Sequence, residues 1–152
     1  MNKKTLAKNT EGLFNYEIID KFSAGIVLSG PEVKSMKNSR VSLRGSYIRI
    51  DHNNEAWLIG CHIAPYEPAK NVQAGYDPQK PRKLLLRKKE ISSLIGKSSQ
   101  KGLTIIPTSV YTNKGLIKVE IALVKGKTKI DKRETIKKRE VDRQIKRTLK
   151  QR

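Results

Sequence analysis

The last 28 residues, Lys125 to Arg152, most constrain how this chain can fold, because they hold much of its charge and few core side chains. They contain 13 Lys and Arg against 4 Asp and Glu, a charge of +9 out of +19 for the whole chain. The segment has no proline, no aromatic residue and no glycine after Gly126. A packed core needs more apolar surface than this composition supplies. We therefore expect a folded body over residues 1–124 and a basic tail over residues 125–152.

The tail sequence predicts a conditional helix. Its apolar residues 136, 141, 145 and 149 lie near helical spacing, and acid–base pairs four residues apart support a helix. Those pairs are Glu134 with Lys138 and Asp142 with Lys146. We expect the tail to be disordered when free and helical along a polyanion that neutralises its basic residues. The alternative is a tail that is merely solvated.

The charge of +19 and the sequence pI of about 10.2 favour nucleic acid as the partner, with an acidic membrane surface second. The single Cys61 excludes a disulfide-stapled scaffold, and no Cys/His cluster has zinc spacing, so a reducing cytoplasm is the expected location. The sequence shows neither a signal-peptide pattern nor an apolar run of about 20 residues. Cys61 and His62 are neighbours on a predicted strand, so they should face opposite sides.

The body is predicted to be mainly β. Alternating or short apolar runs predict strands over Phe14–Phe22, Gly25–Leu28, Val41–Ile50, Ala56–Ile63, Leu103–Tyr111 and Leu116–Val124. The last two runs flank Thr112–Gly115, which is typical of a hairpin. Helices are expected over Pro31–Asn38 and Arg87–Ser99. This pattern favours a small antiparallel barrel or sandwich.

The aromatic residues divide between core and possible base-stacking positions. Tyr47 and Trp57 are expected in the core, since their strands alternate and a small barrel needs its large side chains inside. Tyr66 and Tyr76 fall in the long Pro65–Pro81 loop, where either role is open.

The run Arg82–Lys89 places five basic residues around Leu84, Leu85 and Leu86. One interpretation is a phosphate-tracking surface. The other is a helix with leucines in the core and solvated lysines. Burial is favoured for the leucines and binding for the basic residues, because the tail alone does not account for the charge.

Glu32, Val33 and Lys34, downstream of Asp20, form half of a metal-dependent nuclease pattern. An acid at a helix start explains Glu32 equally well, and such short patterns arise by chance. We therefore expect no enzymatic activity, no metal and no cofactor.

Several motifs in one order resemble the SsrA-binding protein (small protein B) family, from about Asn9 to Arg139. The segments that carry the resemblance are Ala24–Ser35, Ser46-Tyr47, Glu55–Leu58, Asp77-Pro78, Arg82–Leu86, Lys118–Glu120 and Asp131–Arg133. The resemblance implies an OB-like antiparallel β-barrel with flanking helices. It also implies binding to the tRNA-like domain of transfer-messenger RNA and its delivery to stalled ribosomes, with the tail in the vacant mRNA channel near the decoding site.

The resemblance also suggests which residues act. It implies RNA contact by Asn9, Arg82, Lys83 and Leu85, to which the basic run adds Arg87 and Lys88. For the ribosome and its 16S rRNA, it implies Gly126, Lys127, Asp131, Lys132 and Arg133, to which the charge pattern adds Lys138, Arg139 and Arg143. Asp131 would either orient the next two residues or cap the tail helix. A monomer is expected. The alternative function is a ribosomal or ribosome-assembly protein that binds rRNA.

The chain departs from the family pattern at several positions. Thr10 and Glu11 replace a common basic pair, Thr128 replaces a second lysine, and Ile130 replaces a residue able to stack on a base. Ser39 stands where a helix-ending glycine is frequent, so Asn38 is expected to take the left-handed conformation.

Overall fold

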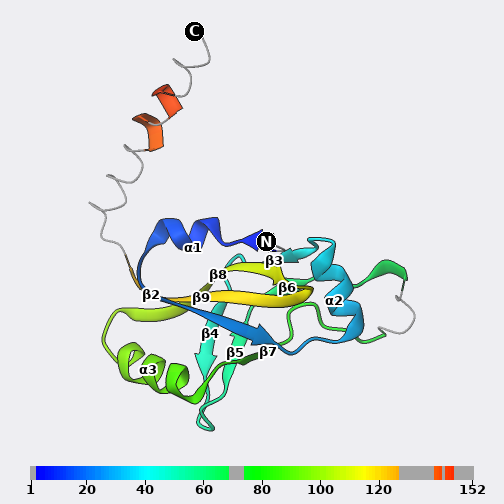
Figure 1. Cartoon of the computed structure of the whole chain (residues 1–152), viewed down its shortest axis with the longest axis horizontal. Coiled ribbons are helices and arrows are strands. Elements are labelled where there is room, and N and C mark those ends of the chain that lie inside the picture. The colour runs from blue at the N-terminus through cyan, green and yellow to red at the C-terminus, as the bar shows by residue number, and fades with distance from the viewer. Residues whose placement is uncertain (1–2, 69–73, 127–138, 142, 146–152) are drawn as a thin grey trace.

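A hairpin of two eleven-residue strands, β8 (Leu103–Asn113) and β9 (Leu116–Gly126), lies at the centre of the fold (Figure 1). Its two-residue turn, Lys114-Gly115, has φ values of 52° and 80°, as a type I′ turn requires. The predicted hairpin is therefore confirmed. The structure is a computed structural model and describes residues 3–68, 74–126, 139–141 and 143–145.

The sheet around this hairpin is antiparallel, with seven strands in the order β1-β8-β9-β2-β7-β5-β4. Its other strands are β1 (Lys4–Lys8), β2 (Tyr16–Ile26), β4 (Tyr47–Ile50), β5 (Ala56–Ile59) and β7 (Arg82–Leu85). A separate pair joins β3 (Val41–Ser42) to β6 (His62–Ile63). The sheet curls so that β4, at one edge, packs against β8 near the other. The mainly β, antiparallel prediction is confirmed.

Three helices flank the sheet: α1 (Thr10–Asn15), α2 (Gly30–Lys37) and α3 (Lys88–Ser98). Ser29 caps α2 in a capping box with Glu32, and Pro31 lies in its first turn. The predicted helices over Pro31–Asn38 and Arg87–Ser99 are thus found within a residue of their ends. Inside the curled sheet, one apolar cluster contains residues of the strands and of the helices α2 and α3, including Met36, Leu58, Leu94 and Ile121.

The strand boundaries differ from the prediction where glycines or short segments intervene. Most of Phe14–Phe22 and the first half of Gly25–Leu28 belong to the single long strand β2, whereas Phe14 lies in α1. Val41–Ile50 and Ala56–Ile63 are each split in two, with positive φ at Gly45 and Gly60. The short elements β1, α1 and β7 were not predicted.

Three further expectations need correction or refinement. Tyr47 is 44% exposed rather than buried, and Trp57 is half-buried with its Nε1 donating to Asp51 Oδ2 at 2.9 Å. The left-handed residue after α2 is Ser39, with φ of 59°, whereas Asn38 has φ of −88°. Asn38 instead donates its backbone N–H to α2 carbonyls and ends the helix there.

A buried ion pair connects α2 to β7. The Arg82 guanidinium lies against the Glu32 carboxylate, with Nη2 to Oε2 at 2.7 Å and Nε to Oε2 at 2.9 Å. Both side chains are 1% exposed. Arg82 Nη1 also donates to the Cys61 carbonyl at 2.6 Å, and Nη2 to the Tyr76 hydroxyl at 2.9 Å. One guanidinium therefore joins α2, β7, the loop before β6 and the long loop.

The network holds Glu32 in its charged form. Burial raises the pKa of this carboxyl, but the hydrogen bonds from Ser29 and Arg82 and the charges of Arg82 and Lys80 together bring it below its ordinary value of 4.5. Burial next to this carboxylate raises the pKa of Tyr76 to about 12. Because the folded-state pKa of Glu32 is depressed, the charged pair stabilises the fold above pH 4.5 and loses that effect as the pH falls through the lower value.

Substitution Glu32→Gln should lower the free energy of unfolding by about 3 kcal/mol near pH 7, because Arg82 is left buried without a counter-charge. Urea unfolding followed by Trp57 fluorescence measures the change. The difference in free energy of unfolding between Glu32→Gln and the wild type should become smaller as the pH falls below 4.5, because the wild-type carboxylate then also loses its charge.

Glu55→Gln is the matched control, since the Glu55–Lys83 pair spans 3.6 Å with both side chains 40% exposed. Its loss should change the free energy of unfolding by less than about 1 kcal/mol. Equal losses from both substitutions would contradict the role given to the buried pair.

Candidate nucleic-acid interface

The outer face of β7 carries two predicted RNA-binding residues, the exposed Leu85 and the half-buried Lys83, whose ammonium lies 3.6 Å from the Glu55 carboxylate. Along this strand Arg82 and Leu84 point inward and are 2% exposed, whereas Lys83 and Leu85 point outward, with Leu85 54% exposed. This alternation follows from the two-residue period of a strand. Of the three leucines whose burial was favoured, Leu84 is buried, Leu86 is half-buried and Leu85 is exposed. An exposed leucine beside a lysine can contact a sugar or base while the ammonium pairs with phosphate.

Leu85 is held by the strand beside it. It pairs with Gly25 of β2, and a Cβ at Gly25 would lie 3.3 Å from Leu85 Cβ and 3.5 Å from its Cδ1. The leucine therefore lies across a strand position where a larger residue would push it away. Val27 lies just beyond the end of β2 and is 52% exposed. Its N–H donates to the Lys83 carbonyl at 2.9 Å. Neither Gly25 nor Val27 was predicted as part of a site, although a glycine inside a strand pattern is a signal of close approach.

Basic side chains continue from β7 into α3. Arg87 is the N-cap residue of α3 and Lys88 its first residue, and both are exposed. The Glu90 carboxylate accepts from the Arg87 N–H at 3.0 Å and so leads the chain into the helix. Lys83, Leu85, Arg87 and Lys88, with Gly25 and Val27 beside them, form what we call the β7 patch.

Two predicted RNA-binding residues are buried instead and support the fold. Arg82 belongs to the Glu32 network. Asn9 is 4% exposed, donates its amide to the Pro107 carbonyl at 2.8 Å and accepts from the Gly12 N–H at 3.2 Å. It thereby caps α1 and fastens that helix to β8. RNA contact by Asn9 or Arg82 stays a prediction, and the structure shows them as positioning residues for α1 and β7.

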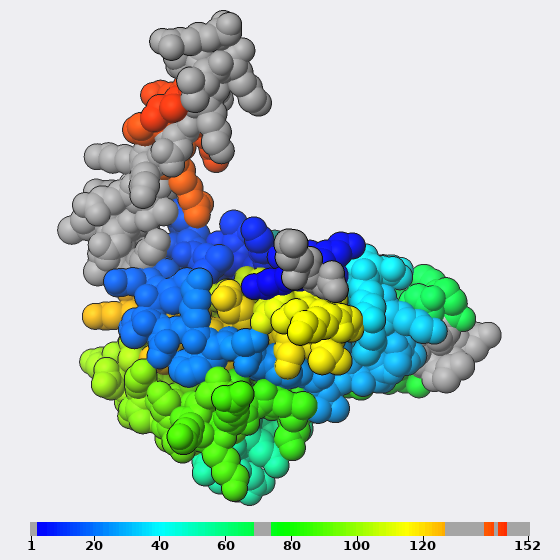
Figure 2. All heavy atoms as spheres, in the orientation of Figure 1, coloured from blue at the N-terminus to red at the C-terminus, as the bar shows by residue number. Residues whose placement is uncertain are grey.

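The tail begins directly from the sheet. Gly126, predicted as a tail residue, ends β9 and pairs with Tyr16 at the start of β2. Lys127, Asp131, Lys132, Arg133 and Lys138 lie outside the described residues, as do Thr128 and Ile130. Residues 139–141 and 143–145 are helical, whereas disorder of the free tail and its folding along a polyanion stay predictions. In Figure 2 the described tail residues project from the body on the side of the N-terminal segment.

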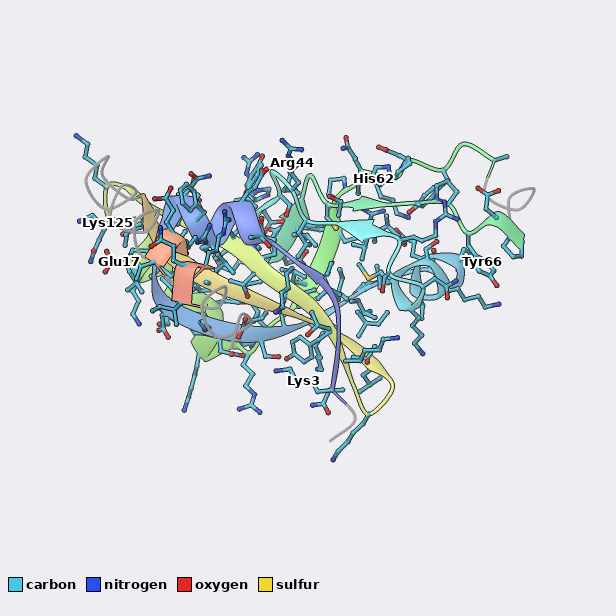
Figure 3. All side chains as sticks on the ribbon, turned by 90° about the horizontal axis from the view of Figure 1, so that it is seen from above. Lys3, Glu17, Arg44, His62, Tyr66 and Lys125 are labelled. Atoms are coloured by element: carbon cyan, nitrogen blue, oxygen red, sulfur yellow. The ribbon has the colours of Figure 1, made fainter. Side chains whose placement is uncertain are left out.

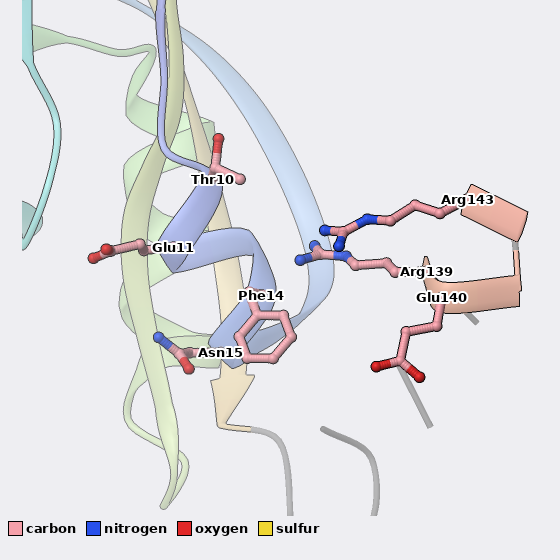
Figure 4. A pocket seen from close by; sticks show the side chains of 7 residues that line it. All are labelled: Thr10, Glu11, Phe14, Asn15, Arg139, Glu140 and Arg143. Atoms are coloured by element: carbon pink, nitrogen blue, oxygen red, sulfur yellow. The ribbon is translucent and has the colours of Figure 1, made fainter. Parts of the chain in front are cut away.

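Arg139 and Arg143 point from this tail helix toward α1 (Figure 4). The Arg139 guanidinium lies over the Phe14 ring, 4.9 Å from its centroid, a cation–π contact. A cleft of about 510 Å³ between the two helices is lined by both arginines and by Thr10, Glu11, Phe14, Asn15 and Glu140. Thr10 and Glu11 thus lie beside the tail. The Glu11 carboxylate lies 3.2 Å from Arg44 Nε, and Figure 4 shows it pointing away from the tail arginines.

The half-pattern of a nuclease is not assembled as a site. The Glu32 carboxylate is bound by Arg82, while Asp20 pairs with Lys97 at 3.0 Å, and that hydrogen bond lowers the pKa of Asp20. Within the described ranges, no three His, Cys, Asp or Glu side chains gather where they could hold a metal ion.

Cys61 is buried and His62 exposed, as their neighbouring strand positions predicted. Burial raises the pKa of the Cys61 thiol to about 11, so it is protonated at neutral pH. No helix among the described residues is long and apolar enough to cross a membrane.

Comparison with known proteins identifies the family. A family model described as "SmpB protein" matches residues 6–151. A relative described as "SsrA-binding protein" from Persephonella marina is 52% identical over 145 residues, which are 95% of this chain and 93% of the relative. Another of the same description, from a Sulfurihydrogenibium species, is 48% identical over 150 residues, 99% of this chain and 97% of the relative.

A solved structure agrees with these sequence relatives. It is described as "tmRNA-SmpB: a journey to the center of the bacterial ribosome", and one of its chains superposes with a TM-score of 0.66 at 40% sequence identity. The superposition covers 86% of this chain and 93% of that one. Body and tail are therefore matched together, and the chain belongs to the SmpB family.

Proposed function

We propose that this protein binds the tRNA-like domain of transfer-messenger RNA and delivers it to stalled ribosomes for trans-translation. The observation that carries the proposal is the full-length match, tail included, to proteins described as SsrA-binding. The β7 patch supports it, because it combines exposed cations with one exposed leucine on an ordered surface. Such a patch suits RNA, which proteins recognise largely through backbone shape and exposed nucleotides.

The tail has a separate task in this proposal. Its basic residues enter the empty mRNA channel near the decoding site and pair with the phosphates of 16S rRNA. Lys127, Asp131, Lys132, Arg133 and Lys138 act there together with Arg139 and Arg143. Gly126 marks the point where the chain leaves the sheet. The protein acts in the cytoplasm as an adaptor without catalytic activity of its own.

Lys83→Ala and Leu85→Ala should each weaken binding to a tRNA-like RNA domain, Lys83→Ala with a salt slope reduced by about one unit because one phosphate contact is lost. Leu85→Ala should leave the salt slope unchanged. Anisotropy titrations at several salt concentrations measure both quantities. Lys101→Ala, an exposed lysine beyond the far end of α3, is the control and should bind like the wild type. Equal losses for Lys83→Ala and Lys101→Ala, with no loss for Leu85→Ala, would indicate charge-only binding and favour a general rRNA-binding role.

Gly25→Ala should weaken RNA binding less than Leu85→Ala, because the added Cβ lies 3.3 Å from Leu85 Cβ and shifts the leucine without removing it. The double variant should bind like Leu85→Ala, since both substitutions act on one contact. Gly96→Ala is the control: a Cβ there meets no atom within 4 Å. Additive losses in the double variant would show that Gly25 does not act through Leu85.

A fragment of residues 1–126 should keep its preference for the tRNA-like domain over ordinary tRNA at high salt, and should not support tagging on stalled ribosomes. The fragment ends at Gly126 because β9 extends that far. Gel-shift competition and a cell-free tagging reaction give the two readouts. A fragment that no longer discriminates between the two RNAs would assign recognition to the tail.

A further inference from the structure

The edge strand β4 presents an aromatic side chain that the core does not use. Tyr47 is the one aromatic residue among the exposed large hydrophobic side chains of the described chain. Side chains alternate along β4, so Tyr47 and Arg49 point outward while Ile48 is buried. The strand register fixes this exposure, because Tyr47 pairs with Ile59 and Arg49 with Trp57 on β5.

Two clefts meet at this tyrosine. One, of about 410 Å³, lies between α1 and the turn that leads into β4 and includes Asn15 and Ser46 in its lining. The other, also of about 410 Å³, lies between β4, α3 and the start of β8 and includes Arg49 and Ile95. Tyr47 and Thr104 line both clefts, which we call the β4 seam. Each volume lies within the range of about 300–1,000 Å³ that is usual for small-ligand sites.

The groups around the seam match the parts of a nucleotide. Asn15 is exposed and points away from the tail arginines in Figure 4, and among the described residues its amide has no hydrogen-bond partner. An amide can both donate to and accept from the edge of a base. Arg49 is exposed, and no carboxylate of the described chain lies within 4 Å of its guanidinium.

The two acidic residues that line the seam are already engaged by partners within the protein. Glu11 lines the cleft next to α1, but Arg44 neutralises its carboxylate. Asp51, in the other cleft, is held by the Trp57 indole and by the backbone N–H groups of Asn53 and Glu55. The seam therefore offers an aromatic face, together with an amide and a guanidinium that have no partner within the part of the chain that the structure describes, on a chain of charge +19.

We propose that the β4 seam binds an unpaired RNA nucleotide, with the base stacked on Tyr47 and the phosphate paired with Arg49. Stacking on an aromatic face is the usual means by which proteins hold single-stranded bases. The inference rests on RNA being the partner under the proposed function, but it uses different residues from the β7 patch.

The test is anisotropy of a labelled six-nucleotide RNA of mixed sequence with the full-length protein at two salt concentrations. Tyr47→Leu should raise the Kd about tenfold, because the stacking face is lost. Tyr47→Phe keeps the ring and should stay within about twofold of the wild type. Leu116→Ala is the control, an exposed apolar side chain in the β8–β9 hairpin that should have no effect. Equal Kd values for wild type and Tyr47→Leu overturn the proposal.

Two further measurements separate the alternatives. Tyr47→Leu should keep its affinity for the folded tRNA-like domain, which the β7 patch contacts. If instead the variant binds the hexamer normally and is lost only from pelleted ribosomes, the seam binds a ribosomal protein and the RNA assignment fails. Failure of the proposed function has a different signature, namely that the wild type itself shows no preference for the tRNA-like domain over ordinary tRNA.

Discussion

The ion pair between Glu32 and Arg82 determines which side chains β7 presents on the surface of this protein. A strand that slips by one residue turns every side chain to the opposite face. Arg82 is fastened from inside by a carboxylate, a tyrosine hydroxyl and a backbone carbonyl, so β7 has one register. Lys83 and Leu85 then point outward of necessity. An interior charge, costly to bury, here specifies an exterior surface.

The body divides its tasks between two ends of the sheet. The β7 patch lies where β2 ends, and the tail leaves where β2 begins, beside α1. Figure 3 shows Glu17 and Lys125 together at the tail end and Tyr66 of the long loop at the other. α1 connects the sheet to the tail, because Asn9 fastens it to β8 and the Phe14 ring lies under Arg139. A short helix that contributes no fully buried residue thus contacts Arg139 of the tail.

The sequence predicted the elements whose pattern is long or whose turn chemistry is explicit. The β8–β9 hairpin, α2 with its proline start and α3 with its apolar spacing are of this kind. β7 was not predicted because one of its inward-facing residues is Arg82. An arginine is expected on the surface unless its buried partner, here Glu32, is known. Tyr47 was assigned to the core because strand alternation fixes which residues share a face but not which face is inside. Glu32 was explained as a helix-start acid, which is half of its role: it caps α2 and binds Arg82 with the same carboxylate.

The paired strands β2 and β9 also set a length. Leu85 lies opposite Gly25, and Gly126 lies opposite Tyr16, nine positions earlier on β2. At about 3.3 Å per residue, these positions lie about 30 Å apart along the strand. The sheet therefore sets the separation between the β7 patch and the point at which the tail begins. Two added residues would lengthen that spacing by about 7 Å with every side chain kept on its face, whereas a single added residue needs a β-bulge such as the one between Ile18 and Asp20.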